Sequence, residues 1–342
     1  MTAARPSAPP PAPAPAPTPP TRRRRRSRLV IALVALALVA AGCRWVPVPG
    51  APDCRLSPAD SYWRARVGGQ PVHPSSDAWI DQTGRSASLK ADFGSGTWDG
   101  GPIGIPYVVV PGDQPRVPVS FTYDDESDPG PYPIPADAPI EGGPASSGDR
   151  HILVLDRDAC TLYETFSTYP DGAGGWDAGS GAVWDLSSND LRPDGWTSAD
   201  AAGLPILPGL VRYEEVAGSG VHHAIRITVP RTRRAYVWPA RHFASSSTDP
   251  TRPPMGAWLR LKASVDPADF GPQTRPIVEA LRTHGAIVAD NGSAWYLSGV
   301  PDERWDNDQL RQLGDLTGDD FEFVDASSMM VDPDSGRATT AR

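Results

Sequence analysis

The residue pair best suited to acid–base chemistry is Arg241-His242, which follows a strand predicted over 234–238 and precedes the polar loop 243–253. A histidine in this place can act as a general acid or base, because its ordinary pKa lies near neutral pH. The neighbouring arginine can hold a carboxylate or an oxyanion. The alternative is a loop histidine that hydrogen-bonds to local backbone.

Lys262, Glu164 and Asp290 complete the candidate catalytic set. Lys262 is one of only two lysines in the chain and ends a predicted strand, 256–263. Glu164 lies on the second strand of a predicted hairpin, and Asp290 lies between two further predicted strands. Convergence of these side chains and His242 on one cleft would favour an enzyme, a hydrolase or lyase. Their separation onto different faces would favour a binding module.

Two tryptophans are candidates for stacking on sugar rings, Trp258 and Trp238. Strand alternation places Trp258 on the same face as Arg260 and Lys262, which gives a cationic and aromatic face. That face suits an acidic glycan. The alternative is an ordinary solvated sheet face.

A dense acidic turn precedes Pro129-Gly130 and contains Asp124, Asp125 and Asp128. Several carboxylates on one loop offer the hard oxygen ligands that calcium prefers. Their spacing differs from that of an EF-hand, and the alternative is a solvated turn without an ion. Calcium is the only cofactor that the sequence suggests.

The N-terminal region has the pattern of a signal peptide. Basic residues at 22–28 precede thirteen apolar residues, 29–41, and small residues lead to Cys43. Ala-Ala-Gly-Cys is similar to a bacterial lipobox, in which the cysteine is lipidated, although Ala40 replaces the usual leucine. Ordinary cleavage nearby and an uncleaved short anchor are the alternatives. We therefore expect an exported protein, either lipid-anchored to the outer face of the membrane or secreted.

If Cys43 carries lipid, Cys54 and Cys160 remain as the other two of the three cysteines. Outside the cell this pair can form a disulfide, because that environment is oxidising.

Charge makes nucleic acid an unsuitable partner. The chain has a net charge of −9, but residues 1–42 hold seven arginines and no acid, so the remainder carries 25 basic and 41 acidic side chains. A body with a net charge of −16 repels phosphate backbones. The expected partners are membrane lipid, through Cys43, and a polysaccharide.

The residues after 58 are typical of a mainly β protein. Predicted strands lie at 105–110, 117–123, 151–156, 160–166, 181–186, 211–216, 222–229, 234–238, 256–263, 286–290 and 294–298. Predicted helices lie at 272–284 and 306–316, with a short one near 57–67. The fold class is a β-sandwich or jelly-roll-like arrangement with a few short helices, in one sheet pair or in two joined sheets.

The chain divides into four predicted parts. Residues 1–43 form the export region, 44–58 a Pro-rich tether, 59–326 a single β-rich domain, and 327–342 a flexible tail. No Gly-x-Ser-x-Gly elbow, P-loop, His-Glu-x-x-His or dinucleotide fingerprint is present, which argues against the familiar enzyme classes that these motifs mark.

Five segments together resemble a family of secreted bacterial proteins of unknown function: 125–135, 153–164, 195–216, 236–245 and 288–295. The resemblance covers roughly residues 75–325. It implies an extracellular protein with one core and brings no catalytic residue with it. From the residues themselves, carbohydrate binding or processing is the first hypothesis, and a non-catalytic module that contacts other envelope proteins is the second.

Overall fold

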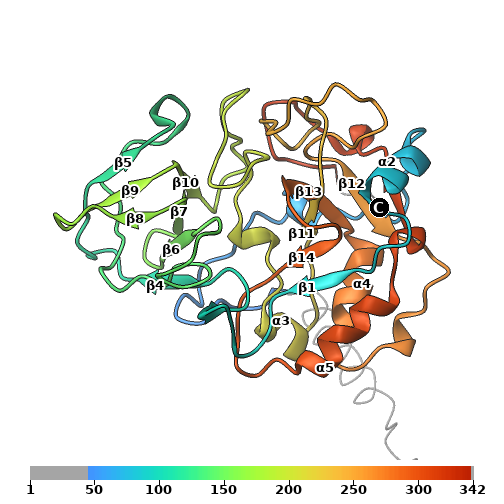
Figure 1. Ribbon diagram of the computed structural model, residues 1–342, viewed down its shortest axis with the longest axis horizontal. Coiled ribbons are helices and arrows are strands. Elements are labelled where there is room, and N and C mark those ends of the chain that lie inside the picture. Colours follow the sequence, from blue (N-terminus) through green and yellow to red (C-terminus); the bar gives the residue numbers. More distant parts are fainter. Residues whose placement is uncertain (1–44, 340–342) are drawn as a thin grey trace, which may run out of the picture. The chain divides into compact units, whose positions relative to one another are not determined.

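The computed structural model describes residues 45–339, so the predicted export region and Cys43 lie outside the described residues. The described part is mainly β, as predicted, with four short α-helices and several 3₁₀ turns (Figure 1). None of the helices in residues 45–339 is long and apolar enough to cross a bilayer.

The larger sheet has six strands and forms the right-hand half of Figure 1. In spatial order they are β1 (Lys90–Asp92), β14 (Tyr296–Ser298), β11 (Ile225–Val229), β13 (Ala286–Asn291), β12 (Trp258–Leu261) and β15 (Phe321–Val324). The β1–β14 and β11–β13 pairs are parallel, and the other pairs are antiparallel. β1 is therefore an edge strand, paired on one side only.

The second sheet has four strands and lies in the left-hand half of Figure 1. Its order is β10 (Ser180–Asp185), β7 (Thr161–Phe166), β6 (Ile152–Asp156) and β4 (Tyr107–Val110). The predicted hairpin is confirmed as β6–β7. Leu153 and Leu155 face one apolar cluster and Ile152 and Val154 face another, so both sides of β6 are buried.

Two small sheets flank the second one. One joins β5 (Val119–Phe121), β9 (Trp176–Ala178) and β8 (Tyr169–Pro170), and the other is a hairpin of β2 (Thr97–Trp98) and β3 (Gly101–Pro102). Gly101 packs against backbone: an added Cβ would lie 2.0 Å from the Gly142 carbonyl carbon. The β2–β3 hairpin thus rests directly on the turn at Gly142.

The helices are α2 (Ser76–Thr83), α3 (Tyr213–Ala217), α4 (Arg275–Thr283) and α5 (Asn307–Leu310). The predicted helix at 272–284 is confirmed as α4, where Ile277, Val278 and Leu281 form the buried side, and α5 with its following 3₁₀ turn occupies the second predicted helix. The short helix expected near 57–67 is a single 3₁₀ turn, Tyr62–Arg64.

Two strand predictions are wrong. Residues 213–217 form α3, because Glu215 accepts a hydrogen bond from the Arg212 backbone and starts a helical turn. Residues 234–238 make only an isolated bridge between Tyr236 and Met255.

The sequence Asp290-Asn291-Gly292-Ser293 does not close a hairpin. β11 lies between β13 and β14, so these two strands are neighbours in sequence but not in the sheet. The Asn-Gly pair therefore connects strands across β11 rather than turning between partners.

The expected tether and tail are both packed on the body within the described residues. Val48, Ala51 and Cys54 are buried, and a disulfide joins Cys54 to Cys160 on the β6–β7 turn. At the other end Met329 and Ala338 are buried. Apolar residues inside polar, Pro-rich stretches anchor both segments.

Candidate functional site

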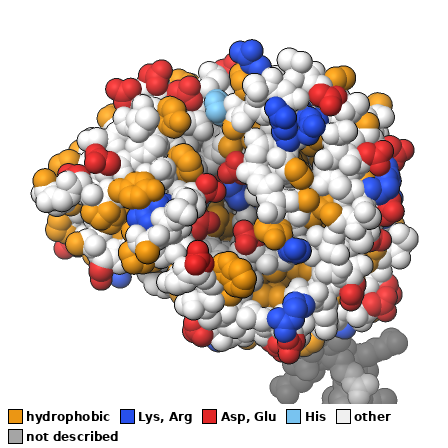
Figure 2. All heavy atoms as spheres, in the orientation of Figure 1, with side chains coloured by type: hydrophobic (Ala, Val, Ile, Leu, Met, Phe, Trp, Pro, Cys, Tyr) orange, Lys and Arg blue, Asp and Glu red, His pale blue; other side chains and the backbone are white. Residues whose placement is uncertain are grey.

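One pocket, of about 560 Å³, lies where β1 and β14 of the six-stranded sheet meet the β2–β3 hairpin and the 141–148 loop. Its lining combines carboxylates (Asp92, Asp99, Glu141), aromatic rings (Trp98, Tyr296), one lysine (Lys90) and the small residues of the 142–148 loop. Figure 2 shows acidic side chains gathered in a hollow near the middle of this face. We call this cavity the first pocket.

Strand β1 supplies one carboxylate of the first pocket. Parallel pairing with β14 sets Lys90 opposite Tyr296 and Asp92 opposite Ser298. The Lys90 ammonium lies 5.3 Å from the centre of the Tyr296 ring. Asp92 is exposed to solvent on the edge strand, although protein atoms of the pocket wall and the charge of Glu141 lie near its carboxyl. Burial, and secondarily that charge, raise the pKa of Asp92.

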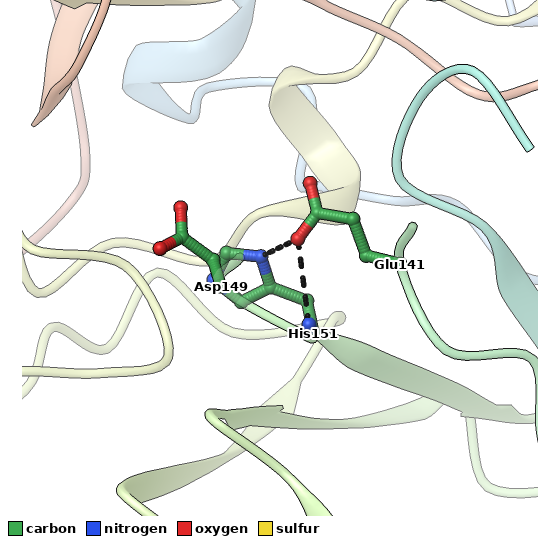
Figure 3. Close-up of side chains that lie close together, drawn as sticks. All are labelled: Glu141, Asp149 and His151. Carbon is green, nitrogen blue, oxygen red and sulfur yellow. Dashed lines mark hydrogen bonds and ion pairs between the residues drawn. The ribbon is translucent and has the colours of Figure 1, made fainter. Parts of the chain in front are cut away.

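The second carboxylate, Glu141, is paired with a histidine (Figure 3). Its Oε2 lies 2.6 Å from Nδ1 of His151, while Nε2 of that ring lies 3.0 Å from the Ala199 carbonyl oxygen. Both partners are acceptors, so both ring nitrogens donate and His151 is an imidazolium. Burial alone would lower the pKa of His151, but Glu141 outweighs it and raises the pKa to about 9.

The histidine in turn keeps Glu141 ionised. Burial would raise the pKa of this carboxyl, but the charge and hydrogen bond of His151 lower it overall. Asp92 and Glu141 therefore line one pocket with pKa values displaced in opposite directions.

Arg150 fixes the loop that carries Glu141. Its buried guanidinium donates to the carbonyls of Pro144 and Ser146, each at 2.9 Å, and to that of Thr168 at 3.0 Å. The residue has a φ of 52°, a left-handed conformation that costs energy for a side chain other than glycine. The many hydrogen bonds of Arg150 hold that conformation, and with it the chain around His151.

A buried charge network lies next to the pocket residues. Arg226 on β11 donates to both oxygens of Asp200, at 2.8 and 2.9 Å, and to Asp290 at 3.1 Å. Burial raises the pKa of Asp290 to about 7, although Arg226 opposes the shift. The charges of Glu141 and Arg226 interact across the interior, which couples this network to the pocket.

Two of the predicted catalytic residues, Glu164 and Asp290, do not line the first pocket, and both hold structure. Glu164 is fully buried and accepts hydrogen bonds from the amides of Ile206 and Leu207 and from the indole of Trp184. Burial raises the pKa of Glu164 to about 7, and the backbone donors oppose it. Asp290 is held by Arg226 as described above.

Arg241, His242 and Lys262 do not join them. The Arg241 guanidinium is buried and donates to the carbonyls of Arg192 and Pro333 and to Asp334. His242 bonds to the Ala201 carbonyl, and Lys262 to the Asp319 carbonyl. None of the three lines the first pocket. The convergence of His242, Lys262 and a carboxylate on one cleft, which would have favoured an enzyme built on these residues, is therefore not found among residues 45–339.

The predicted stacking tryptophans are corrected as well. Trp258 is 1% exposed because β12 is an inner strand with both faces covered, and Trp238 packs edge-on against Tyr62. By contrast Trp98, which the sequence reading did not select, is 79% exposed and lines the first pocket together with Tyr296.

The predicted calcium turn is a 3₁₀ turn, Asp124–Glu126, with exposed carboxylates. Asp128 forms an ion pair with the buried Arg192 and accepts from the Val183 amide, both through its Oδ2 atom. That oxygen therefore has a structural role, which fits a turn held by protein contacts better than a shared set of calcium ligands.

Within residues 45–339, a cluster of three side chains has possible ligand atoms close to one another. Atoms of Glu141, Asp149 and His151 lie within 4.8 Å of one another. A metal would need a ring nitrogen of His151, but both nitrogens donate hydrogen bonds, which fits an ion pair better than a metal centre.

Comparisons with protein-family models, with curated proteins and with solved structures gave no match for this chain.

The sequence reading did not select Asp92, Glu141 or Asp149, and it treated His151 as a strand start. A usable local signal was present: Glu141 precedes Gly142-Gly143, and Asp149-Arg150-His151 opens the best hairpin. Glycine allows a close approach of backbone to another element, and Gly142 here packs against Gly101 of the β2–β3 hairpin.

Proposed function

We propose that this protein is an exported glycan-processing protein and that its first pocket hydrolyses a glycosidic bond. The observation that carries the proposal is the pair Asp92 and Glu141, two carboxyls in one pocket with opposite pKa displacements. Hydrolysis of a glycoside needs one protonated and one ionised carboxyl at the scissile bond.

In the proposed reaction Asp92 is the general acid. The bond between the anomeric carbon and the glycosidic oxygen breaks, and the proton of Asp92 passes to the departing oxygen. Water supplies the hydroxyl group to the anomeric carbon, and Glu141 accepts the proton that this water releases. His151 keeps Glu141 ionised before the reaction, since its imidazolium lies 2.6 Å from the carboxylate.

The rest of the lining supports a sugar ligand. Trp98 and Tyr296 offer ring faces on which the apolar face of a sugar can stack. With Asp92 protonated as the general acid, Asp99 and Glu141 remain as carboxylates beside Lys90, so a neutral sugar or an amino sugar suits the pocket better than an acidic glycan. This lining narrows the carbohydrate hypothesis drawn from the sequence.

Export is supported by the disulfide between Cys54 and Cys160. Disulfides persist mainly in oxidising compartments outside the cytosol. With this pair bonded, Cys43 is the remaining cysteine of the chain, which is the residue that the lipobox-like pattern marks for lipid.

The test is a depolymerisation screen of the full chain against neutral, amino-sugar and acidic polysaccharides, read by new reducing ends. We expect Asp92→Asn and Glu141→Gln each to lower cleavage about 10²–10⁴-fold, the range for losing a general acid or base. His242→Ala is the matched control and should retain full activity. Binding to a polysaccharide without cleavage would favour a glycan-binding module over the hydrolase. Neither cleavage nor binding would favour a module that contacts other envelope proteins.

A further inference from the structure

A second cavity of about 410 Å³ adjoins the first pocket. The two share three lining residues, Lys90, Ala91 and Ile103. Because Asp92 is the next residue of β1, the shared wall lies directly beside the proposed general acid. We call this cavity the second pocket.

The second pocket follows the start of β1. Its remaining lining is Ser88, Leu89, Phe93, Asn307, Leu310, Arg311 and Gly314. Asn307 accepts from the Ser95 amide and donates to the Ser95 carbonyl, both at 3.0 Å, which fixes the chain after β1 against α5. The wall is thus built from two elements that are tied together.

Because β1 is an edge strand, both pockets can border it. β1 pairs only with β14, so no strand of residues 45–339 covers its other edge. Each pocket alone falls in the range of roughly 300–1,000 Å³ that is common for small-molecule sites. A single terminal sugar therefore needs only the first pocket, and the second offers space for more units of the same molecule.

We infer that the substrate is a glycan chain that runs across β1 through both pockets, so that the bond cut is internal to the chain. This inference rests on the proposed hydrolase function and specifies its substrate as a polymer rather than a terminal unit. The polymer's remaining units occupy the second pocket.

Gly314 offers a way to close the second pocket while sparing the first. A Cβ added at Gly314 would have its nearest neighbour at 3.9 Å, the Leu89 carbonyl oxygen, so Gly314→Ala fits without displacement. Gly314→Phe extends a ring from the same position into the second pocket. Gly314 lines only this pocket of the two.

The experiment compares two probes: the 4-nitrophenyl glycoside of the sugar identified by the screen, and end-labelled oligosaccharides of two to eight units from the cleaved polysaccharide. Wild type should release internal fragments. Gly314→Phe should lower kcat/KM at least 10-fold on six to eight units and less than 2-fold on the aryl glycoside, with Gly314→Ala near wild type on both.

Two results would overturn the inference. Release of single terminal units by wild type, or equal effects of Gly314→Phe on both probes, would remove the chain-crossing substrate while hydrolysis by Asp92 and Glu141 still stood. Absence of cleavage of every probe by wild type would reject the proposed function and this inference together.

Discussion

The substitution Glu141→Gln tests the electrostatic reasoning at the site independently of any substrate. It replaces the carboxylate that lies 2.6 Å from Nδ1 of His151 by a neutral amide. The other ring partner, the Ala199 carbonyl, remains. His151 is then a buried histidine that keeps only the weaker influence of the Asp149 charge, and burial favours the neutral ring.

The expected shift is large. In the native protein the pKa of His151 is about 9, and burial without Glu141 should bring it below the ordinary value of 6.5. The difference is at least ~2.5 units, or about 3 kcal/mol at 1.36 kcal/mol per unit. His151 is 1% exposed, so solvent screening reduces this interaction little.

The measurement is an NMR titration of histidine rings labelled with ¹³C and ¹⁵N, from pH 5 to 10, with His151→Asn to assign the resonance. Asp149→Asn is the matched control: Asp149 contributes to the pKa of His151 less than Glu141 does, so its loss should cause a smaller decrease. A wild-type His151 that titrates near 6.5, or one whose titration is the same in Glu141→Gln, would refute the ion pair.

The same pair fixes the pH dependence of stability. The pKa of His151 is raised on folding, so its contribution is complete below about 6.5 and is lost as pH rises through about 9. The pKa of Glu141 is lowered, so its contribution is lost as pH falls below about 4.5. The difference in unfolding free energy between wild type and Glu141→Gln should therefore be largest near pH 5–6.5.

Three further outcomes are expected. Replacing Cys54 and Cys160 by serine should lower the unfolding free energy, measured by urea denaturation, by about 4–5 kcal/mol, because the disulfide closes a loop of sequence separation 106 and so restricts the unfolded chain. A loss below 1 kcal/mol would contradict this entropic explanation. Burial lowers the pKa of His284 to about 4, so the unfolding free energy should fall by about 3 kcal/mol as pH drops from 6.5 to 4. In urea titrations at several pH values, His284→Gln should abolish most of this pH dependence. Arg150→Ala should speed amide hydrogen exchange in residues 141–149 at least 10-fold and leave exchange in β11 unchanged, because the Arg150 guanidinium binds the carbonyls of that loop. An equal increase in both regions would mean global destabilisation instead.

The parts of the fold that the sequence predicted correctly are those specified by neighbours along the chain. β6 and β7 are joined by a short turn and pair with each other. In α4 the apolar residues Ile277, Val278 and Leu281 recur at helical spacing and form the buried side. The segment 211–216 looked like a strand from its apolar residues. Contacts of Glu215 with the Arg212 amide and guanidinium accompany a helical turn there instead.

The candidate site was not predictable in the same way, because three distant segments build it. Asp92 comes from an edge strand, Glu141 from a glycine-containing loop, and Tyr296 from the strand that pairs with β1. No local pattern relates these positions. Arg241 and His242 had the residue types for catalysis, yet the Arg241 guanidinium is occupied by main-chain carbonyls and an aspartate.

Under the proposed hydrolase function, composition and the first pocket both disfavour acidic glycans. The sequence after residue 42 carries 41 acidic against 25 basic side chains, and with Asp92 protonated the first pocket still sets Asp99 and Glu141 against Lys90. Two like charges 4 Å apart repel by about 1 kcal/mol in water and about 4 kcal/mol near a protein surface. A uronic acid or sulfated sugar would meet this repulsion at the point of cleavage, whereas an amine on the sugar would be attracted. In the proposed reaction, the ionised Glu141 would disfavour an acidic substrate as well as accept the proton of water.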